Sequence, residues 1–322
     1  MDQLPILEAL PRLRQALDAS QIILEAPPGA GKSTRLPLWL LEQPDIRGRI
    51  IMLEPRRLAA RTIAQYLAQQ LGEAPGGRVG YRMRGESRIG KHTRLEVVTE
   101  GVLTRMLQAD PELEGVSLLV FDEFHERSLQ ADLALAFALE CQALREDLKI
   151  LVMSATLEGL ALEQLLPDAV TVSSAGRSFP VELEYQPRNQ HSRLEEAMGR
   201  AVLGSLERHP GSVLAFLPGE REIRATHDWL ADRLADGVEL RPLYGRLTLA
   251  EQQAAIAPAA AGRRKVVLAT NVAETSLTID GIGIVVDSGL ERQAQFDPEA
   301  GITRLLSRQI GQASATQRAG RA

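Results

Sequence analysis

Cysteine, lysine and aromatic side chains are scarce in this sequence of 322 residues. Its one cysteine, Cys141, excludes an internal disulfide framework and a cysteine-cluster zinc site, and it fits a reducing compartment. No apolar run approaches the roughly 20 residues that span a bilayer, and the first ten residues lack the basic charge of a secretory signal. We therefore expect a globular, cytoplasmic protein that does not span a membrane.

An excess of positive charge is also missing. The formal net charge is −5 and the sequence pI is about 5.7. Proteins that coat nucleic acid non-specifically carry a basic excess, because neutralised phosphates supply most of that affinity. If this chain binds nucleic acid, we expect a local groove with few phosphate contacts.

Short apolar runs alternate with amphipathic helical stretches along the whole chain, which predicts α/β sheets with helices on both faces. The expected strands are Ile22–Glu25, Arg49–Leu53, Leu95–Thr99, Ser117–Phe121, Lys149–Met153, Ser212–Phe216, Val238–Pro242, Lys265–Ala269 and Gly283–Val286. The clearest expected helices are Leu58–Leu71, Gly101–Gln108 and Gly219–Leu234.

A break in this pattern falls at Val172–Pro180, where small polar residues end in a proline. The series of strands restarts after it, so we predict two domains, residues 1–174 and 175–322. The alternative is one large sheet interrupted by a long surface loop.

A phosphate-binding loop is predicted at residues 26–34, APPGAGKST, directly after the first strand. Gly29 and Gly31 would let backbone N–H groups wrap a phosphate at the start of a helix. Lys32 would reach the β- and γ-phosphates, and Ser33 would offer its hydroxyl to Mg²⁺. A glycine-rich turn without a ligand is the alternative.

Two acids, Asp122 and Glu123, end the apolar run SLLVF. A buried strand that ends in two acids delivers them to the carboxyl edge of a parallel sheet, beside the predicted phosphate loop. There Asp122, with Glu123, would hold Mg²⁺, and Glu123 would orient or deprotonate the attacking water.

The run DEFHER at 122–127 resembles the signature of DEAH-box superfamily 2 RNA helicases, with Phe124 in place of the usual alanine. Further segments resemble family motifs in the family's order. They are LEPRRLAAR (53–61), VGYRMR (79–84), TEGVLTR (99–105), SAT (154–156), FLPGEREI (216–223), ATNVAETSLTIDG (269–281) and QRAGR (317–321). Within the family, the DEFHER variant is most similar to the bacterial HrpB-like helicases.

This resemblance implies two tandem RecA-like domains, each with a mostly parallel sheet, that use ATP or another NTP together with Mg²⁺. It implies nucleotide contacts for a set of residues in both domains: Gly29, Gly31, Lys32, Ser33, Thr34, Asp122, Glu123, Ser276, Thr278 and Asp280. It further implies that Gln317 positions the water, that Arg321 is an arginine finger, and that His125, Ser154 and Thr156 couple the nucleotide site to domain closure.

The resemblance also implies backbone contacts to RNA at Arg56, Thr99 and Thr270, which would make binding independent of base sequence. Between the last two motifs, residues 287–305 contain two β-prone stretches around an Asp-Pro turn. In the family this region is a hairpin that helps to separate duplex strands. The alternatives are a plain hairpin, and a solvated helix start at Arg56 and Arg57.

Two departures from the family pattern affect the expected activity. Ile256 stands where the family often places an aromatic residue against the nucleobase, so we expect little preference among nucleotides. The sequence ends at Ala322, before the family's last motif reaches its next arginine, and without the family's C-terminal modules. We expect a piece of a longer helicase with weakened activity.

The predicted function is NTP hydrolysis coupled to movement along single-stranded or partly duplex RNA. The alternatives are a nucleotide-dependent RNA clamp without productive hydrolysis, and a translocase that acts on DNA. Protein partners cannot be read from the residues.

Overall fold

The computed structural model describes residues 4–157, 161–174, 181–187, 192–274 and 279–322. The chain divides into two compact units, Met1–Arg177 and Ser178–Ala322. The predicted boundary at residues 174 and 175 stays a prediction.

The first unit is built on an eight-stranded sheet in the order β4-β3-β5-β2-β6-β7-β1-β8. All neighbouring strands are parallel except the β3–β4 pair. The strands are β1 (Gln21–Glu25), β2 (Arg49–Leu53), β3 (Val79–Met83), β4 (Glu86–Arg88), β5 (Leu95–Val98), β6 (Val116–Phe121), β7 (Lys149–Ser154) and β8 (Val170–Ser173).

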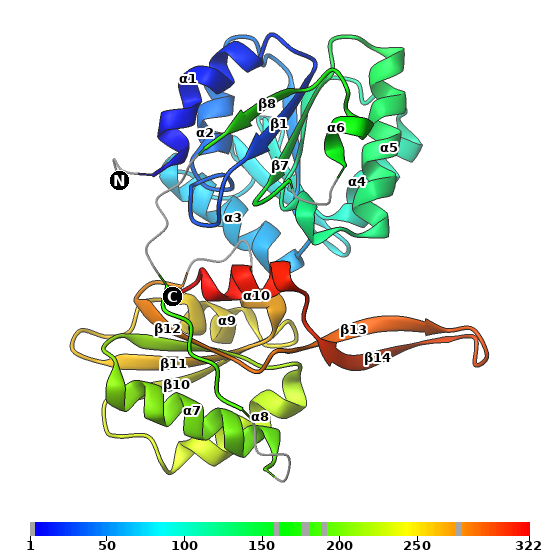
Figure 1. The fold of residues 1–322 in the computed structure, drawn as a ribbon. Helices are drawn as coiled ribbons and strands as arrows, with labels where there is room; N and C mark the ends of the chain where they lie inside the picture. Colours follow the sequence, from blue (N-terminus) through cyan, green and yellow to red (C-terminus); the bar gives the residue numbers. More distant parts are fainter. Residues whose placement is uncertain (1–3, 158–160, 175–180, 188–191, 275–278) are drawn as a thin grey trace. The chain divides into compact units, whose positions relative to one another are not determined.

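Helices cover both faces of this sheet, as Figure 1 shows. They are α1 (Ile6–Ala16), α2 (Leu36–Leu41), α3 (Arg57–Gln70), α4 (Glu100–Ala109), the 3₁₀ turn η1 (Phe124–Glu126), α5 (Leu129–Leu144) and α6 (Leu162–Leu165). Successive side chains of one strand enter different cores: Ile22 and Leu24 pack with α1, α2 and α3, whereas Ile23 packs with α4, α5 and α6. Strands buried on both faces explain the continuous apolar runs of the sequence.

The second unit contains a parallel sheet in the order β10-β11-β9-β12 and a separate antiparallel hairpin, β13–β14. Its elements are α7 (Leu194–Arg208), β9 (Ser212–Phe216), α8 (Glu220–Ala231), β10 (Val238–Leu243), α9 (Leu249–Ile256), β11 (Arg264–Ala269), the 3₁₀ turn η2 (Asn271–Ala273), β12 (Ile282–Asp287), β13 (Leu290–Asp297), β14 (Ile302–Gln309) and α10 (Gln312–Ala319). Residues of α7 and α8 pack against one face of the sheet, and α9 and α10 contact the other.

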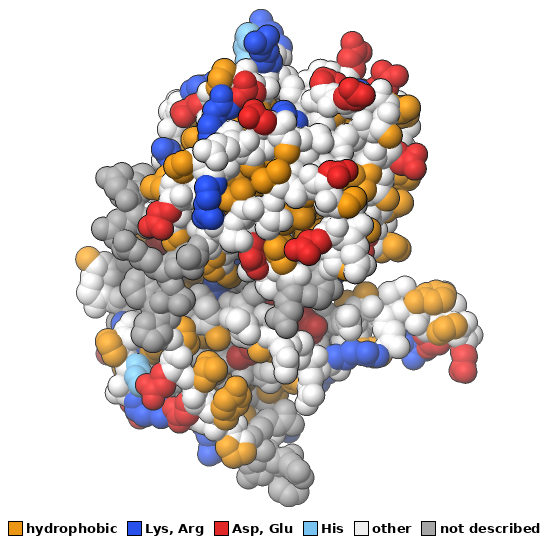
Figure 2. Space-filling model, turned by 45° about the horizontal axis from the view of Figure 1, so that its top comes forward, with side chains coloured by type: hydrophobic (Ala, Val, Ile, Leu, Met, Phe, Trp, Pro, Cys, Tyr) orange, Lys and Arg blue, Asp and Glu red, His pale blue; other side chains and the backbone are white. Residues whose placement is uncertain are grey.

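The hairpin extends away from the four-stranded sheet of its own unit (Figure 1). Its side chains are exposed almost throughout, including Phe296, Ile302, Leu305 and Leu306. Hydrophobic side chains are visible on this arm in Figure 2, where acidic and basic groups are otherwise mixed over the surface shown.

These elements confirm the predicted α/β class, with two tandem, mostly parallel domains. All nine expected strands are present within two residues of their predicted ends, and the predicted hairpin is β13–β14. The sequence pattern missed β3, β4 and β8. The predicted break at Val172–Pro180 begins too early, because Val172 lies in β8 and pairs with Leu24 of β1. None of the described helices has the length and apolar character needed to cross a membrane.

Candidate functional site

The predicted phosphate loop leaves the carboxyl end of β1 and turns through two glycines with positive φ. The φ angle is 76° at Gly29 and 95° at Gly31, a region that favours glycine. A Cβ atom at Gly31 would also lie 3.0 Å from the Cγ2 atom of Ile6. The N–H of Arg35 donates to the Gly31 carbonyl at 2.8 Å, so a helical turn already forms ahead of α2. The loop thus has the strand–loop–helix form that binds phosphate.

Lys32 is the one lysine in this loop, and its side chain is buried, with 4% exposure. Its ammonium group donates to the Ala26 carbonyl at 2.5 Å, across the loop. Lys32 therefore lies within the loop, and its charge is held by a neutral carbonyl that a phosphate oxygen could replace.

Asp122 and Glu123 lie where β6 ends and are both buried. Asp122 is fixed from both sides: its N–H donates to the Leu53 carbonyl at 3.0 Å, and its Oδ1 accepts from the Glu123 N–H at 2.9 Å. Glu123 has φ 51°, in the left-handed region, which costs a non-glycine residue on the order of 1–2 kcal/mol. Such backbone strain gathers at functional sites.

The charge state of Asp122 is set by opposing influences. Burial, the largest cause, and the Glu123 carboxylate raise the pKa of Asp122 to about 7, while the nearby Lys32 ammonium and Ser33 hydroxyl lower it. Among the residues that the structure describes, its Oδ2 atom has no hydrogen-bond partner. A buried carboxylate oxygen without a partner is a ready ligand for a cation.

The order of the strands brings the loop and the acids together. In the sheet, β7 lies between β6 and β1, so the residues after all three meet at one edge. The N–H of Ala26 donates to the carbonyl of Ser154, the last residue of β7, at 3.0 Å. The predicted set Lys32, Ser33, Asp122 and Ser154 is therefore gathered at the carboxyl edge of one sheet, where α/β proteins bind ligands.

His125 connects the acids to the segment after β7. Its Nε2 atom lies 3.3 Å from the Oε2 atom of Glu123, and its Nδ1 atom accepts from the Ala155 N–H at 3.1 Å. Because Nδ1 is an acceptor, the proton of a neutral imidazole resides on Nε2, toward Glu123. The Thr156 N–H donates to the Ser154 hydroxyl at 3.3 Å. His125 thus joins Glu123 to the backbone of Ala155, which lies between Ser154 and Thr156.

The site fits Mg²⁺ by the chemistry of its donors: a hydroxyl at Ser33 and carboxylates at Asp122 and Glu123. A divalent cation would also favour ionised Asp122 against the effect of burial. The described part of the chain contains no cluster of three or more His, Cys, Asp or Glu residues placed to hold a metal. A cation at this site would therefore take its remaining ligands from nucleotide and water.

The predicted RNA contacts of the first unit lie at the starts of two helices. Arg56 precedes α3, but its guanidinium is paired with the Glu126 carboxylate, with Nη2 3.0 Å from Oε2. The Arg56 side chain is 21% exposed and therefore not freely solvated, whereas Arg57 at the start of α3 is exposed. Thr99 precedes α4 and forms no side-chain cap. Arg56, Glu123 and Glu126 line a pocket of about 240 Å³ beside the acids.

The second unit carries the other predicted residues, of which Ser276 and Thr278 lie outside the described residues. Thr270 follows β11, and its hydroxyl accepts from the Val272 N–H at 3.4 Å. Asp280 is exposed just before β12. Gln317, on α10, is buried, and the Arg321 guanidinium donates to the Glu274 carbonyl at 2.7 Å. The Arg321 side chain is therefore not freely solvated.

The most buried charge near these residues was not predicted. Arg318 is 1% exposed, and it pairs with Glu274 at 3.0 Å and Asp287 at 2.9 Å. Its guanidinium also stacks over Phe216, 4.9 Å from the ring centre. It thereby joins α10 to the ends of β9 and β12. In the sequence, only its place in the run QRAGR points to Arg318, and the family resemblance gives roles in that run to Gln317 and Arg321 alone.

Comparisons with known proteins show the family of this chain. Residues 8–165 match the model of the DEAD/DEAH box helicase family, and residues 190–322 match the helicase conserved C-terminal domain. The chain is 59% identical over 324 residues to the ATP-dependent RNA helicase HrpB of Escherichia coli (strain K12), covering 100% of this chain and 40% of that protein. It is 38% identical over 331 residues to the ATP-dependent RNA helicase HrpA of the same organism, covering 99% of this chain and 25% of that protein.

Two solved structures share the fold. The crystal structure of Escherichia coli DEAH/RHA helicase HrpB matches with a TM-score of 0.95 and 59% identity, covering 99% of this chain and 41% of that one. The crystal structure of E. coli DExH-box NTPase HrpB matches with a TM-score of 0.88 at the same identity, covering 100% and 40%. This chain thus spans two fifths or less of the length of the curated relatives. The two family models match the chain one after the other, and the chain belongs to the DEAD/DEAH box helicase family.

Proposed function

We propose that this chain is the motor core of an NTP-dependent RNA helicase, which hydrolyses ATP and other nucleoside triphosphates and moves along single-stranded RNA. One observation carries the proposal. A buried lysine and two buried acids meet at one sheet edge, and the Asp122 Oδ2 atom is without a hydrogen-bond partner among the described residues. The names of the relatives, both ATP-dependent RNA helicases, support the choice of ATP and RNA.

In this proposal the backbone of residues 29–34 holds the phosphates, and Lys32 exchanges its bond to the Ala26 carbonyl for a phosphate oxygen. Ser33, Asp122 and Glu123 would hold Mg²⁺, which when bound neutralises charge on the triphosphate. Glu123 would orient the attacking water, with His125 3.3 Å from its carboxylate to restrain it.

The contributions proposed for the second unit rest on the family resemblance. Gln317 and Arg321 would act on the reacting phosphate, and Ser276, Thr278 and Asp280 would sense the nucleotide.

Arg56, Thr99 and Thr270 would contact RNA. The paired state of Arg56 makes its RNA contact an exchange reaction, because a phosphate must compete with Glu126 for the same guanidinium.

The test is Mg²⁺-dependent hydrolysis of ATP by the purified chain, with and without single-stranded RNA. We expect Lys32→Ala to lower the rate about 100-fold or more, because one preorganised charge at the phosphates is lost. Lys149→Ala is the matched control: Lys149 also donates to a backbone carbonyl, that of Ala19, but at the opposite end of β7. Nucleotide-dependent RNA binding without any hydrolysis would contradict the motor.

Base preference is tested by the same assay with ATP, GTP, CTP and UTP. Ile256, the half-buried last residue of α9, offers no aromatic face, so we expect rates within about tenfold of one another. Ile256→Phe should favour the purine nucleotides. Stimulation of hydrolysis by DNA and not by RNA would identify a DNA translocase. We also propose a cytoplasmic location for the protein.

A further inference from the structure

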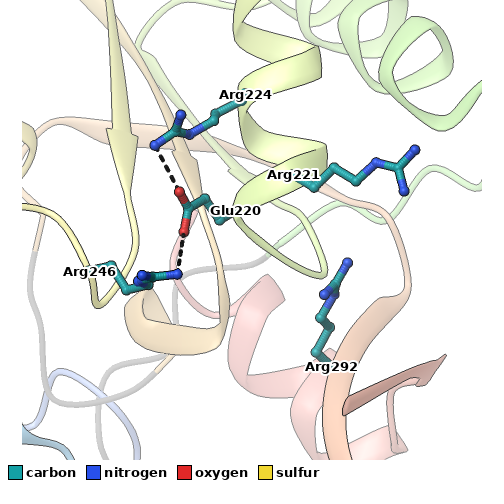
Figure 3. A pocket seen from close by; sticks show the side chains of 5 residues that line it. All are labelled: Glu220, Arg221, Arg224, Arg246 and Arg292. Carbon is teal, nitrogen blue, oxygen red and sulfur yellow. Dashed lines mark ion pairs between the residues drawn. The ribbon is translucent and has the colours of Figure 1, made fainter. Parts of the chain in front are cut away.

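Many carboxylates of this protein are paired with arginines, as Glu220 is with Arg224 and Arg246 in Figure 3. Glu25, the half-buried last residue of β1, differs from these, because no basic side chain pairs with it among the described residues. It directly precedes the phosphate loop, where a carboxylate would repel a bound triphosphate. Contact with the nucleotide therefore does not explain an acid at this position.

The Glu25 side chain belongs to a row of polar groups at the carboxyl edge of the first sheet. Glu25 is the register partner of Ser154 on β7 and of Ser173 on β8. Register partners on neighbouring strands are about 4.8 Å apart, and their side chains leave the same face of the sheet. Side chains alternate along a strand, so this is the face of Ile23, which packs with α5 and α6. The row thus crosses β7, β1 and β8 on one face.

Both carboxylate oxygens of Glu25 accept hydrogen bonds at this edge. The Oε1 atom accepts from the Leu157 N–H at 3.2 Å, and the Oε2 atom accepts from the Ser173 hydroxyl at a longer 3.4 Å. The Leu157 side chain packs against the same core as Ile23. Its N–H directly follows residues 154–156, which are expected to couple the nucleotide site to domain closure. Glu25 therefore ties the end of this segment to β1.

The segment after β7 is held at two points by side chains from other strands' ends. At the first point the Ala155 N–H donates to His125, whose other ring nitrogen lies 3.3 Å from the Glu123 carboxylate. At the second point the Leu157 N–H donates to Glu25. If the second point is lost, the segment can shift, and the imidazole that it holds at the first point can shift with it.

We infer that Glu25 is a positioning residue of the motor, which acts on Glu123 through residues 154–157 and His125. The inference rests on the proposed function, in which Glu123 orients the attacking water. Misplacement of a water-orienting group slows the chemical step, whereas the phosphate contacts of Lys32 do not involve the Glu25 carboxylate. Glu25 should therefore contribute to kcat and not to the binding of nucleotide.

Steady-state hydrolysis of ATP by the whole chain, with Mg²⁺ and single-stranded RNA, separates these two effects. We expect Glu25→Ala to lower kcat about fivefold to tenfold, the effect of one lost hydrogen bond to a charged group. The KM for ATP should not rise, because the variant removes a negative charge near the phosphate loop. Glu25→Gln keeps the side-chain length and an oxygen acceptor, and its kcat should stay within about twofold of the parent value.

A second readout requires neither nucleotide nor metal. Hydrogen exchange of the Leu157 amide in the free protein should become about fivefold faster or more in Glu25→Ala, and should stay close to the parent rate in Glu25→Gln. The matched control is Glu73→Ala. Glu73 also accepts from a backbone N–H, that of Arg78 at 2.7 Å, but it precedes β3 and so lies at the amino edge of the sheet. Its removal should change neither kcat nor exchange at Leu157.

Thermal unfolding identifies any variant that fails to fold. In a folded Glu25→Ala protein, a parent-like kcat or parent-like exchange at Leu157 would overturn the inference. Equal losses of kcat in Glu25→Ala and Glu25→Gln would also overturn it, because the charge and not the hydrogen bond would then matter, and so would a raised KM with unchanged kcat. The motor is judged separately, by hydrolysis in the parent and in Lys32→Ala. A parent without hydrolysis defeats the motor, and exchange at Leu157 then still decides whether Glu25 holds the segment.

Discussion

Individual side chains in this protein are kept in states that are unfavourable for folding alone, and Asp122 is the clearest example. Its carboxyl group is 2% exposed, and burial raises its pKa from 3.8 to about 7. Between these two values the unfolded chain carries the ionised group and the folded chain the protonated one. Folding stability contributed by Asp122 is therefore lost as pH rises through this window, and the full penalty remains above it.

Asp122→Asn should therefore raise the melting temperature of the metal-free protein at about pH 8, because the buried charge is gone. A gain of about 1 kcal/mol corresponds to about 2–4 °C for a unit of this size. The gain should shrink at about pH 5.5, where most folded molecules carry the protonated acid. Melting curves in a chelator at both pH values measure it, and Mg²⁺-dependent hydrolysis should be lost. A lower melting temperature at the higher pH would contradict the assignment.

Arg318 shows the opposite behaviour, since its buried charge is paired twice. Arg318→Met would leave Glu274 and Asp287 without this partner, and we expect a loss of about 3–5 kcal/mol. In a Trp39→Phe background, Trp229 is the only tryptophan, so its fluorescence in a denaturant titration follows the second unit. Arg241→Met, which breaks the exposed pair with Glu239, should cost less than about 1 kcal/mol. Equal effects of the two changes would contradict the proposed importance of Arg318.

The carbonyl groups in the last turn of helix α9 accept hydrogen bonds from a side chain of strand β11. Lys265, the second residue of β11, is 1% exposed, and its ammonium donates to the carbonyls of Ala255, Ile256 and Ala257. These carbonyls lie at the end of α9, where a helix has no partners of its own, and a positive charge is favourable there. Burial, the largest cause, lowers the pKa of Lys265, while the carboxylates of Asp280 and Glu239 raise it.

Lys265→Met should destabilise the second unit by about 2–3 kcal/mol, because buried carbonyls lose a charged donor. Lys149 supplies the matched control: it is the first residue of β7 and donates to the single carbonyl of Ala19 at 3.2 Å. Lys149→Met should cost about 1 kcal/mol. Denaturant titrations followed by Trp229 for the first change and by Trp39 for the second would measure both. A cost at Lys265 no larger than at Lys149 would show that α9 needs no donor.

The limits of prediction from sequence are visible in the same elements. The buried strands were found because they are continuous apolar runs. By contrast, β3 contains Gly80 and Arg82, β4 has only three residues, and β8 has only four residues and is mostly exposed. Lys32 and Asp122 were found because each belongs to a short sequence motif that predicts its chemical role. The pairing of Arg318 with Glu274 joins residues 44 positions apart, and such a contact leaves no periodic signal.

At the scale of the whole chain, an acidic protein is proposed to bind a polyanion. With a net charge of −5, affinity must come from local clusters of basic side chains and not from the charge of the whole chain. We therefore expect fewer than about five phosphate contacts, and a slope of log K against log salt no steeper than about −3.5 for single-stranded RNA. A salt titration of binding measures the slope. A much steeper value would mean that basic contacts outside these clusters take part.

The β13–β14 hairpin adds a mechanical property to the second unit. Eight residue pairs, from Leu290↔Gln309 to Asp297↔Ile302, join its strands without a shift in register. Eight residues of antiparallel strand extend about 27 Å. At its base the Arg292–Glu222 pair ties it to α8. By the geometry of such an arm, a rotation of about 10° at the base carries the tip about 5 Å, so the hairpin converts a small angular change in its own unit into a displacement comparable to the spacing of two strands.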